Sequence, residues 1–327
     1  MKILLIGLGS IGKRHLRNLA HLGYSDITVV TSQTTLSPEF SAFSTFTNLQ
    51  DALASSSYHA AFICTPTALH MPTLLGLLRA NVPNIYVEKP VSHSLESVEE
   101  ALLLANSYNS RVVVGYDLHF EAGLQIVKKL LDKGAIGKLA SANVQVGQYL
   151  PDWRPHEDYR KGMSASRQMG GGVMLDLVHE FDYLLWLCGA IQQVACFYNN
   201  SGALQIETED VAEVLLSFSN GAIGTIHLDY LQQKLVRNCL LTGHNGSIQW
   251  DLAKGCVRHI NQQKEEKLYD VSSYERNDRF IEIVSSFLSG KSDDRLTTLP
   301  QSIESLRLVL AAKYAAEQNT IVQLNAF

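Results

Sequence analysis

Short apolar runs separated by amphipathic stretches dominate the first third of the chain. The first run, Lys2–Ile6, is apolar at four of its five positions, which indicates a strand buried on both faces. Four further runs of this kind are Ile27–Val30, Ala60–Cys64, Pro83–Val87 and Arg111–Gly115. Helical patterns lie between them, most clearly over residues 70–80 and 95–106. This alternation predicts an α/β fold whose parallel sheet binds ligands where its strands end.

The rest of the chain changes to longer alternating segments joined by turns. The clearest predicted elements are a helix over Ala122–Asp132, a strand ending at Phe218, a hairpin turn at Asn220-Gly221 and a returning strand over Ala222–Tyr230. Near the end of the chain, helices are predicted over Phe280–Leu288 and, after a proline, over Ile303–Ala316, followed by a short strand. A broad sheet with one apolar face would need a cover, and a second subunit is a natural one.

The first predicted strand runs directly into a glycine-rich turn. Gly7, Gly9 and Gly12 are spaced G-x-G-x-x-G between a strand and an amphipathic helix. The first glycine permits the tight turn, the second lets the backbone approach a pyrophosphate, and the third lets helix and strand pack closely. The helix N-terminus at Ser10 and Ile11 could face an anion. The turn therefore predicts a dinucleotide site, with a purely structural turn as the alternative.

The residues after the second strand bear on which dinucleotide is bound. A site for NAD usually has an Asp or Glu here, which holds the 2′-hydroxyl group of the ribose. This chain has Thr31 and Ser32 instead, which could donate hydrogen bonds to the 2′-phosphate of NADP, with charge from Lys13 or Arg14. The pattern favours NADP, although two small polar residues also suit an ordinary turn.

Two further strand ends carry residues typical of a reaction site. Thr65 and Pro66 follow the third strand, where a nicotinamide ribose would pass, and His70 begins the next helix. Glu88 and Lys89 follow the next strand and precede a proline. The lysine ammonium group could donate a proton to a reacting carbonyl group or polarise it. The alternative is an ion pair between this lysine and its neighbouring glutamate at the surface.

The stretch from Tyr149 to Arg167 mixes aromatic side chains with arginines. It includes Trp153, Arg154 and Tyr159. Aromatic rings stack on a sugar or a base, and guanidinium groups bind phosphate or carboxylate through two parallel hydrogen bonds. The stretch therefore predicts a substrate-binding segment, and a solvated loop anchored by its tryptophan is the alternative.

A glycine triplet at 170–172 precedes a nearly apolar helix predicted over Val173–Leu187. Asp176 and His179 lie three positions apart on this helix and therefore share one face. An apolar helix tolerates such a pair if it is hydrogen-bonded or functional. The carboxylate could orient the imidazole, so that His179 acts as a general acid or base. A structural pair in the core is the alternative.

Composition narrows the class of function. A length of 327 residues exceeds the usual size of one hydrophobic core and indicates two domains. The net charge of −5, without a long basic run, disfavours nucleic acid and anionic membranes as partners. No apolar segment reaches the ~18 residues that a membrane span needs. The five cysteines are scattered without zinc spacing, which predicts buried thiols in a reducing cytoplasm and no metal site.

Together the motifs resemble those of the glucose–fructose oxidoreductase, inositol dehydrogenase and MocA (Gfo/Idh/MocA) family. The shared motifs are the glycine turn, Thr-Pro-x-x-x-His, Glu-Lys-Pro and Gly115-Tyr116, and the likeness continues through the second half of the chain. The resemblance implies a Rossmann domain, which we place at residues 1–119. It also implies an α+β domain with an open, mostly antiparallel sheet, which we place at residues 120–327.

The resemblance also implies roles for individual residues. Lys89 matches the family's proton donor or acceptor beside the nicotinamide. Asp176 and His179 match its substrate-site motif, although the family commonly spaces these two residues by four positions. Tyr116 and His119 join the predicted substrate residues. The family often has Asn-x-Arg-Phe after its Gly-Tyr, and His119 stands in place of that arginine, which puts a carried-over contact at this position in doubt.

These observations predict a cytoplasmic NAD(P)-dependent oxidoreductase. It would move a hydride to or from a secondary hydroxyl or ketone group of a sugar-like substrate, for which an anionic or nucleotide-activated sugar is a candidate. It would form a homo-oligomer, a dimer or a tetramer. The predicted cofactor residues are Gly7, Gly9, Ser10, Ile11, Gly12, Thr31, Ser32, Thr65, Pro66, His70, Glu88 and Lys89. A non-catalytic sensor or scaffold that retains a dinucleotide fold is the alternative function.

Overall fold

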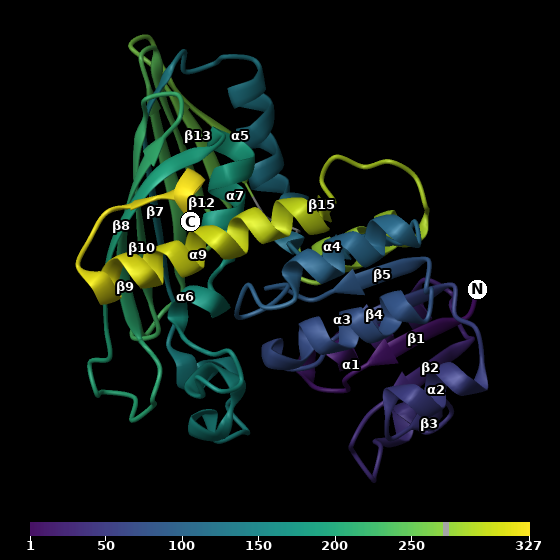
Figure 1. Ribbon diagram of the computed structural model, residues 1–327. Coiled ribbons are helices and arrows are strands. Elements are labelled where there is room, and N and C mark those ends of the chain that lie inside the picture. Colours follow the sequence, from purple (N-terminus) through teal and green to yellow (C-terminus); the bar gives the residue numbers. More distant parts are fainter. Residues whose placement is uncertain (271–274) are drawn as a thin grey trace. The chain divides into compact units, whose positions relative to one another are not determined.

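The computed structural model describes residues 1–270 and 275–327, which form two compact units (Figure 1). The first unit contains Met1–Asp117 and Arg276–Ile303, and the second contains Leu118–Glu275 and Glu304–Phe327. The predicted boundary after residue 119 thus lies two residues beyond the first change of unit. The prediction of one uninterrupted domain over 120–327 does not hold for residues 276–303, which return to the first unit.

The first unit is built on a mainly parallel sheet. Its strands are β1 (Ile3–Ile6), β2 (Ile27–Val30), β3 (Ser44–Phe46), β4 (Ala60–Ile63), β5 (Asn84–Val87), β6 (Arg111–Val114) and β15 (Thr297–Thr298). They lie in the order β15-β6-β5-β4-β1-β2-β3, and every pair is parallel except β15 with β6. Every residue of β1, β2 and β4 is buried, as expected for strands covered on both faces. The predicted Rossmann fold is confirmed, because strands β1–β6 follow its strand order.

Helices connect these strands. They are α1 (Ser10–His21), α2 (Leu49–Ser55), α3 (His70–Arg79), α4 (Val98–Ser107) and α8 (Asp278–Leu288). The strand order reverses between β1 and β4, so right-handed crossovers place α1 and α3 on opposite faces of the sheet. The segment that returns late in the chain adds α8, which packs on α1, and β15 at the edge of the sheet.

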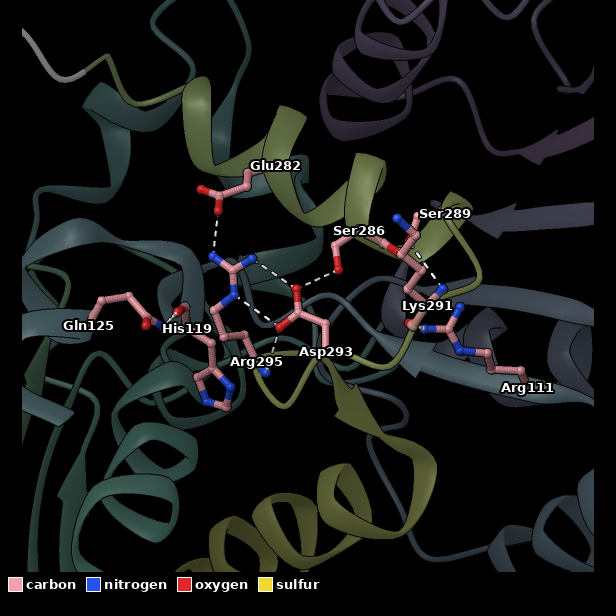
Figure 2. A network of polar contacts seen from close by, with 9 residues as sticks. All are labelled: Arg111, His119, Gln125, Glu282, Ser286, Ser289, Lys291, Asp293 and Arg295. Carbon is pink, nitrogen blue, oxygen red and sulfur yellow. Dashed lines mark hydrogen bonds and ion pairs between the residues drawn. The ribbon is translucent and has the colours of Figure 1, made fainter. Parts of the chain in front are cut away.

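A polar network fastens the returning segment within the first unit (Figure 2). Arg295 donates hydrogen bonds to Asp293 from Nε (3.0 Å) and Nη2 (2.8 Å) and pairs with Glu282 on α8. The Ser286 hydroxyl donates to the same aspartate over 2.6 Å. These bonds, above all those from Arg295, hold the pKa of Asp293 well below its usual range. Arg111 on β6 donates to the main-chain oxygens of residues 287 and 291. This pairing between distant segments explains the wrong domain boundary.

The second unit is built on a broad and mostly antiparallel sheet. Its strands are β7 (Leu139–Gly147), β8 (Ile191–Asn199), β9 (Val211–Phe218), β10 (Ile223–Asp229), β11 (Val236–Gly243), β12 (Gly246–Asp251), β13 (Cys256–Ile260), β14 (Glu265–Asp270) and β16 (Val322–Gln323). Their order is β14-β13-β12-β11-β7-β10-β9-β8-β16, and only the pairing of β7 with β10 is parallel among the described strands. The predicted open, predominantly antiparallel sheet is confirmed.

One face of this sheet is packed and the other is open. Along β9, buried residues such as Val214 and Leu216 alternate with the exposed Glu213 and Leu215. Helices α5 (Ala122–Asp132) and α7 (His179–Cys188) contact the sheet. Helix α9 (Leu299–Gln318) contributes residues to both units.

Two predicted helices differ most from the observed ones. The helix predicted over Val173–Leu187 is broken into α6 (Val173–Asp176) and α7, because Leu177 (ψ 31°) leaves the helical conformation. Helix α9 begins at Leu299 rather than at Ile303, since a proline in the first turn of a helix needs no hydrogen-bond acceptor for its nitrogen. None of the helices among the described residues is long and apolar enough to cross a membrane.

Candidate functional site

The glycine turn after β1 has the geometry that a bound pyrophosphate requires. Gly7 has φ +94°, and a Cβ atom there would lie 2.7 Å from the carbonyl carbon of Cys64. A Cβ atom on Gly12 would collide with the carbonyl oxygen of Gly7, so the third glycine packs directly on the first. Gly9, by contrast, has no atom within 4 Å of the position of a Cβ. The turn is therefore tight on its protein side and open at its middle glycine, just before the N-terminus of α1.

The turn after β2 is tied to this glycine turn. The main-chain N–H of Gln33 donates to the Thr31 hydroxyl (3.2 Å), and the Gln33 side chain donates to the carbonyl oxygen of residue 8 (2.8 Å). Thr31 is buried, whereas Ser32 is exposed. Of the two basic residues suggested by the sequence, Arg14 lies over the Phe280 ring at 4.5 Å. Lys13 is instead close enough to Glu39 to lower its pKa, alongside the stronger effect of Arg17.

The turn after β4 is fixed by His70. The hydroxyl group of Thr65 is buried and has no hydrogen-bond partner among the described residues, while Pro66 is exposed. The His70 side chain is buried, with Nδ1 2.7 Å from the Pro90 carbonyl oxygen and Nε2 2.9 Å from that of Thr65. Burial lowers the pKa of His70, and the two carbonyl oxygens act in the opposite direction. No ring nitrogen of this predicted cofactor residue remains for a cofactor.

The turn after β5 carries the predicted catalytic lysine. Glu88 is buried, and its Oε1 lies 2.6 Å from Nε2 of the fully buried His15 on α1. Lys89 is half-buried. Gly115, at the end of β6, makes room for this arrangement, because a Cβ atom there would lie 2.5 Å from the Tyr86 hydroxyl and 3.2 Å from Glu88 Oε1. Glu88 is therefore not a surface residue, and its carboxylate pairs with a buried histidine.

In the second unit, Asp176 and His179 stand on either side of the break between α6 and α7. Both are buried. The Tyr230 hydroxyl donates to Asp176 Oδ2 over 2.7 Å, and burial raises the tyrosine's pKa well above its usual value. The Trp153 ring meets the Tyr230 ring edge-on, with centroids 5.4 Å apart. Asp176 therefore belongs to a buried polar site with an aromatic wall, at the end of β10.

Two ion pairs with buried carboxylates lie around α6 and α7. Lys313 on α9 lies 3.0 Å from Glu209, whose carboxylate occupies the space that a side chain on Gly172 would need. Gly172 has φ +111°, so both its conformation and its surroundings require glycine. On α7, Glu180 is fully buried and accepts two hydrogen bonds from Arg237 on β11, at 2.7 and 2.9 Å.

His119 and Tyr116 are both buried, in different units. His119 Nε2 lies 2.7 Å from Asp182 Oδ2, and its ring stacks on Trp186 with centroids 4.3 Å apart. Asp182 also accepts a hydrogen bond from Ser305. These contacts place His119 against α7, and the substrate contact predicted for this position stays a prediction.

The other predicted substrate residues lie in the segment between β7 and α6. Arg154 is exposed and lies 3.9 Å from Glu157. The Tyr159 hydroxyl donates to the carbonyl oxygen of residue 204 over 3.1 Å. Arg167 donates from Nε to the main-chain oxygen of Glu207 over 2.9 Å. Trp153 shares the neighbour Tyr230 with Asp176, whereas Arg167 is bonded to a neighbouring loop through Glu207.

Two residues that contact predicted site residues, His15 and Tyr230, are not evident from the sequence. His15 and Glu88 are 73 positions apart, and Asp176 and Tyr230 are 54 apart, so no local pattern connects them. Tyr230 appears in the sequence as one more position of an alternating strand. No group of three or more His, Cys, Asp or Glu side chains within the described ranges is arranged to hold a metal ion.

The comparison with known proteins agrees with this architecture. Residues 1–116 match an oxidoreductase family with an NAD-binding Rossmann fold, and residues 124–249 match the GFO/IDH/MocA C-terminal domain. The chain belongs to the Gfo/Idh/MocA family. Both domains of the family are thus present. The Rossmann match lies in the first unit, and the C-terminal-domain match lies in the second.

Related Gfo/Idh/MocA sequences are distant. The uncharacterized oxidoreductase YrbE of Bacillus subtilis is 27% identical over 235 residues, which are 68% of this chain and 65% of YrbE, slightly less than two thirds of that relative. Myo-inositol 2-dehydrogenase of Thermotoga maritima is 22% identical over 240 residues, which are 69% of this chain and 67% of the relative.

Solved structures share the fold over the whole chain. The WlbA dehydrogenase from Bordetella pertussis, in complex with NADH and UDP-GlcNAcA, has a TM-score of 0.81 at 20% identity, covering 99% of this chain and 98% of WlbA. Levoglucosan dehydrogenase in complex with NADH has a TM-score of 0.87 at 17% identity and covers 99% of both chains. These likenesses establish the fold.

Proposed function

We propose that this Gfo/Idh/MocA protein transfers a hydride between a nicotinamide cofactor and the carbon that bears a secondary hydroxyl or ketone group in a sugar-like substrate. The cofactor is held by the first unit, and the substrate is oriented by the second. Lys89 or His179 exchanges the hydroxyl proton, and Asp176 orients His179. The acceleration comes mainly from placing the reacting carbon against the nicotinamide ring and from proton transfer.

The observation that carries this proposal is the glycine turn. Gly7 and Gly12 are packed against the protein, whereas Gly9 leaves open space at the N-terminus of α1. Gly9 has φ −74°, a conformation that any residue adopts, so neither backbone strain nor crowding accounts for a glycine here, whereas the close approach of a pyrophosphate does. Asp176, which accepts a hydrogen bond from Tyr230, and His179 are both buried, and this supports a reaction, because buried ionisable groups gather at catalytic sites.

The substrate class rests on the relatives and on the predicted binding segment. Named relatives include an inositol dehydrogenase, and a neighbour of the same fold was solved with UDP-GlcNAcA. Trp153 supplies an aromatic wall beside Tyr230, which suits the apolar face of a sugar ring. Arg154 is exposed, and guanidinium groups bind phosphate and carboxylate. We therefore propose an anionic or nucleotide-activated sugar as the substrate.

The experiment that tests the proposed function is a fluorescence titration of the pure protein with NADPH and, in parallel, with NADH. We expect both to bind, with NADPH favoured because no acidic residue follows β2. The matched variant is Gly9→Leu. Since a Cβ atom at Gly9 meets nothing within 4 Å, the variant should fold, and its side chain should occupy the pyrophosphate space. Its affinity should fall at least about tenfold, which corresponds to about 1.4 kcal/mol.

Two outcomes of this titration would change the proposal. If neither nucleotide binds, the turn is structural and the protein is a scaffold or sensor. If Gly9→Leu binds as tightly as the wild type while both fold equally well, the cofactor is not where we place it. Preferred binding of NADH would remove the proposed role of Thr31 and Ser32 in holding a phosphate.

The open face of the second unit's sheet is proposed as the contact between copies of this chain. Phe197 on β8, Leu215 on β9 and Ile223 on β10 are 75%, 57% and 61% exposed. Apolar side chains of this size on neighbouring strands are typical of an interface.

Sedimentation equilibrium should show that the wild type is a dimer or tetramer, and Leu215→Asp should shift the equilibrium towards the monomer. Leu103→Asp, on the 67% exposed leucine of α4, is the control. A monomeric wild type at micromolar concentration would refute the interface.

A further inference from the structure

The turn that carries Lys89 is held at both of its ends by buried side chains. Glu88 and Pro90, the residues on either side of the lysine, are buried, while Lys89 itself is half-buried. The main-chain N–H of Glu88 donates to the carbonyl oxygen of residue 63 at the end of β4 (2.9 Å). The backbone of the turn is thus anchored to the sheet, and two histidines hold the polar groups next to the lysine.

His15 holds the glutamate on the N-terminal side of the lysine. It lies on α1, three positions after Gly12, and is fully buried. Its Nε2 is 2.6 Å from Glu88 Oε1. Its Nδ1 is buried and makes no hydrogen bond within the described part of the chain, so the ring proton belongs on Nε2, where it is donated to the carboxylate. The helix that starts at the glycine turn therefore reaches the turn of the lysine.

His70 holds the residue on the C-terminal side of the lysine. It is the first residue of α3, and its Nδ1 lies 2.7 Å from the carbonyl oxygen of Pro90. Its Nε2 lies 2.9 Å from the carbonyl oxygen of Thr65, in the turn after β4. Because burial lowers the pKa of His70, the ring is neutral and has a single N–H, which donates to one of these two oxygens. The shorter distance places this N–H on Nδ1, where it donates to Pro90, and the other ring nitrogen lies against the Thr65 turn.

Packing alone does not account for this arrangement. Both rings are buried, but each directs a nitrogen to a polar atom of a residue adjacent to Lys89, and each comes from the helix that follows a predicted cofactor turn. A proton-transfer group that is misplaced by about 1 Å can lose about 10²-fold in rate. A lysine with a flexible four-carbon side chain gains most from a fixed main chain.

We infer that His15 and His70 are positioning residues that fix Lys89 from both sides and couple its position to the two cofactor turns. The inference rests on the proposed function, in which Lys89 exchanges a proton with the substrate. Neither histidine touches the reacting atoms; each acts through the residue next to the lysine.

The test replaces each of the two histidines, in separate variants, by asparagine and by glutamine. The amide nitrogen of asparagine replaces Nδ1 of a histidine, and that of glutamine replaces Nε2. His70→Asn should keep the bond to Pro90, and His15→Gln should keep the bond to Glu88. We expect these two variants to retain most of the turnover, whereas His70→Gln and His15→Asn should lose about 10²-fold in kcat, with a smaller change in KM. Asparagine should thus be tolerated at position 70 and glutamine at position 15. Opposite preferences of this kind indicate that the histidines position the lysine through specific hydrogen bonds.

A second measurement does not depend on activity. Reductive methylation with formaldehyde and a borane reductant, read by peptide mass spectrometry, reports how accessible the Lys89 amine is. Labelling should be faster in His70→Gln and His15→Asn than in the wild type, and close to the wild type in the two rescuing variants. His21→Gln and His21→Asn, on the exposed histidine of the last turn of α1, are the controls.

The outcomes separate this inference from the proposed function. If Lys89→Ala keeps full turnover, the proposed role of the lysine fails, and the labelling pattern still decides whether the histidines position it. If Lys89→Ala is inactive but asparagine and glutamine are equivalent at both sites, in turnover and in labelling, the histidines only fill space and the inference is overturned.

Discussion

Lys89→Ala is expected to lower kcat by about 10²–10⁴-fold, the range that a positioned proton-transfer group contributes. The lysine follows β5, at the carboxyl edge of the sheet where an α/β fold binds its ligands, and its neighbours are fixed by buried contacts. NAD(P)H should still bind, because the glycine turn is unchanged. The measurement is steady-state reduction of the nicotinamide, followed by absorbance over a panel of sugars, inositols and nucleotide sugars.

Three further variants make this result specific. Lys89→Arg keeps the positive charge but cannot give up its proton, so it should be nearly as slow as the alanine variant. Lys133→Ala, on an exposed lysine after α5, should match the wild type. His179→Ala in the same assay decides which of the two residues exchanges the proton. Wild-type turnover of Lys89→Ala would remove the lysine from the mechanism, and wild-type turnover of Lys89→Arg would leave it a purely electrostatic role.

The elements that were predicted well depend on short stretches of sequence. The buried strands of the first unit and α5 are specified by apolar runs and helical spacing over a few residues, and their bounds differ from the prediction by two residues at most. The glycine turn is likewise local, since its three glycines lie within six consecutive residues and the third packs on the first. Such features can be inferred because the residues that stabilise them are neighbours in the chain.

The features that were missed depend on partners far along the chain. The break between α6 and α7 separates Asp176, which pairs with Tyr230, from Glu180, which pairs with Arg237. An apolar helical pattern cannot show that its polar residues have partners on different strands. Residues 276–303 were assigned to the wrong domain for the same reason, because residues 118–275 of the second unit lie between β6 and β15 in the chain.

The candidate site follows the same division. The sequence proposes Lys89, Asp176 and His179 as candidates, because each stands out locally as a polar residue at a strand end or in an apolar segment, and their roles stay predictions. It did not identify His15 or Tyr230, whose surroundings are ordinary for a helix and a strand. The arginines between residues 149 and 167 were predicted to bind an anion. In the structure, the main-chain N–H of Arg167 donates to the Glu207 carboxylate and its Nε donates to the main-chain oxygen of Glu207. Local chemistry therefore points to candidate reactive groups, whereas the buried groups that contact them become evident only in the folded chain.

Arg237→Met is expected to destabilise the second unit by about 3–5 kcal/mol. Arg237 on β11 donates two hydrogen bonds to Glu180, whose side chain on α7 has no exposed surface. Without the arginine, a carboxylate remains in the core with its main cationic partner removed, and its desolvation is no longer compensated. For a unit of this size, each kcal/mol lowers Tm by roughly 2–4 °C. Thermal unfolding followed by circular dichroism measures the shift.

The double variant distinguishes the cost of a buried charge from the loss of packing. Glu180→Leu combined with Arg237→Met removes both charges and should recover most of the lost stability, since apolar residues of similar volume commonly replace a buried pair without loss. Arg258→Met is the control, because Arg258 on β13 is exposed and its pair with Glu265 at 3.4 Å should contribute at most about 1 kcal/mol.

If Arg237→Met unfolds at the same temperature as Arg258→Met, the buried pair does not hold α7 against the sheet. If the double variant is as unstable as Arg237→Met, the loss lies in packing instead. Because α7 begins at His179, a loss of stability here should also reduce turnover before the unit unfolds.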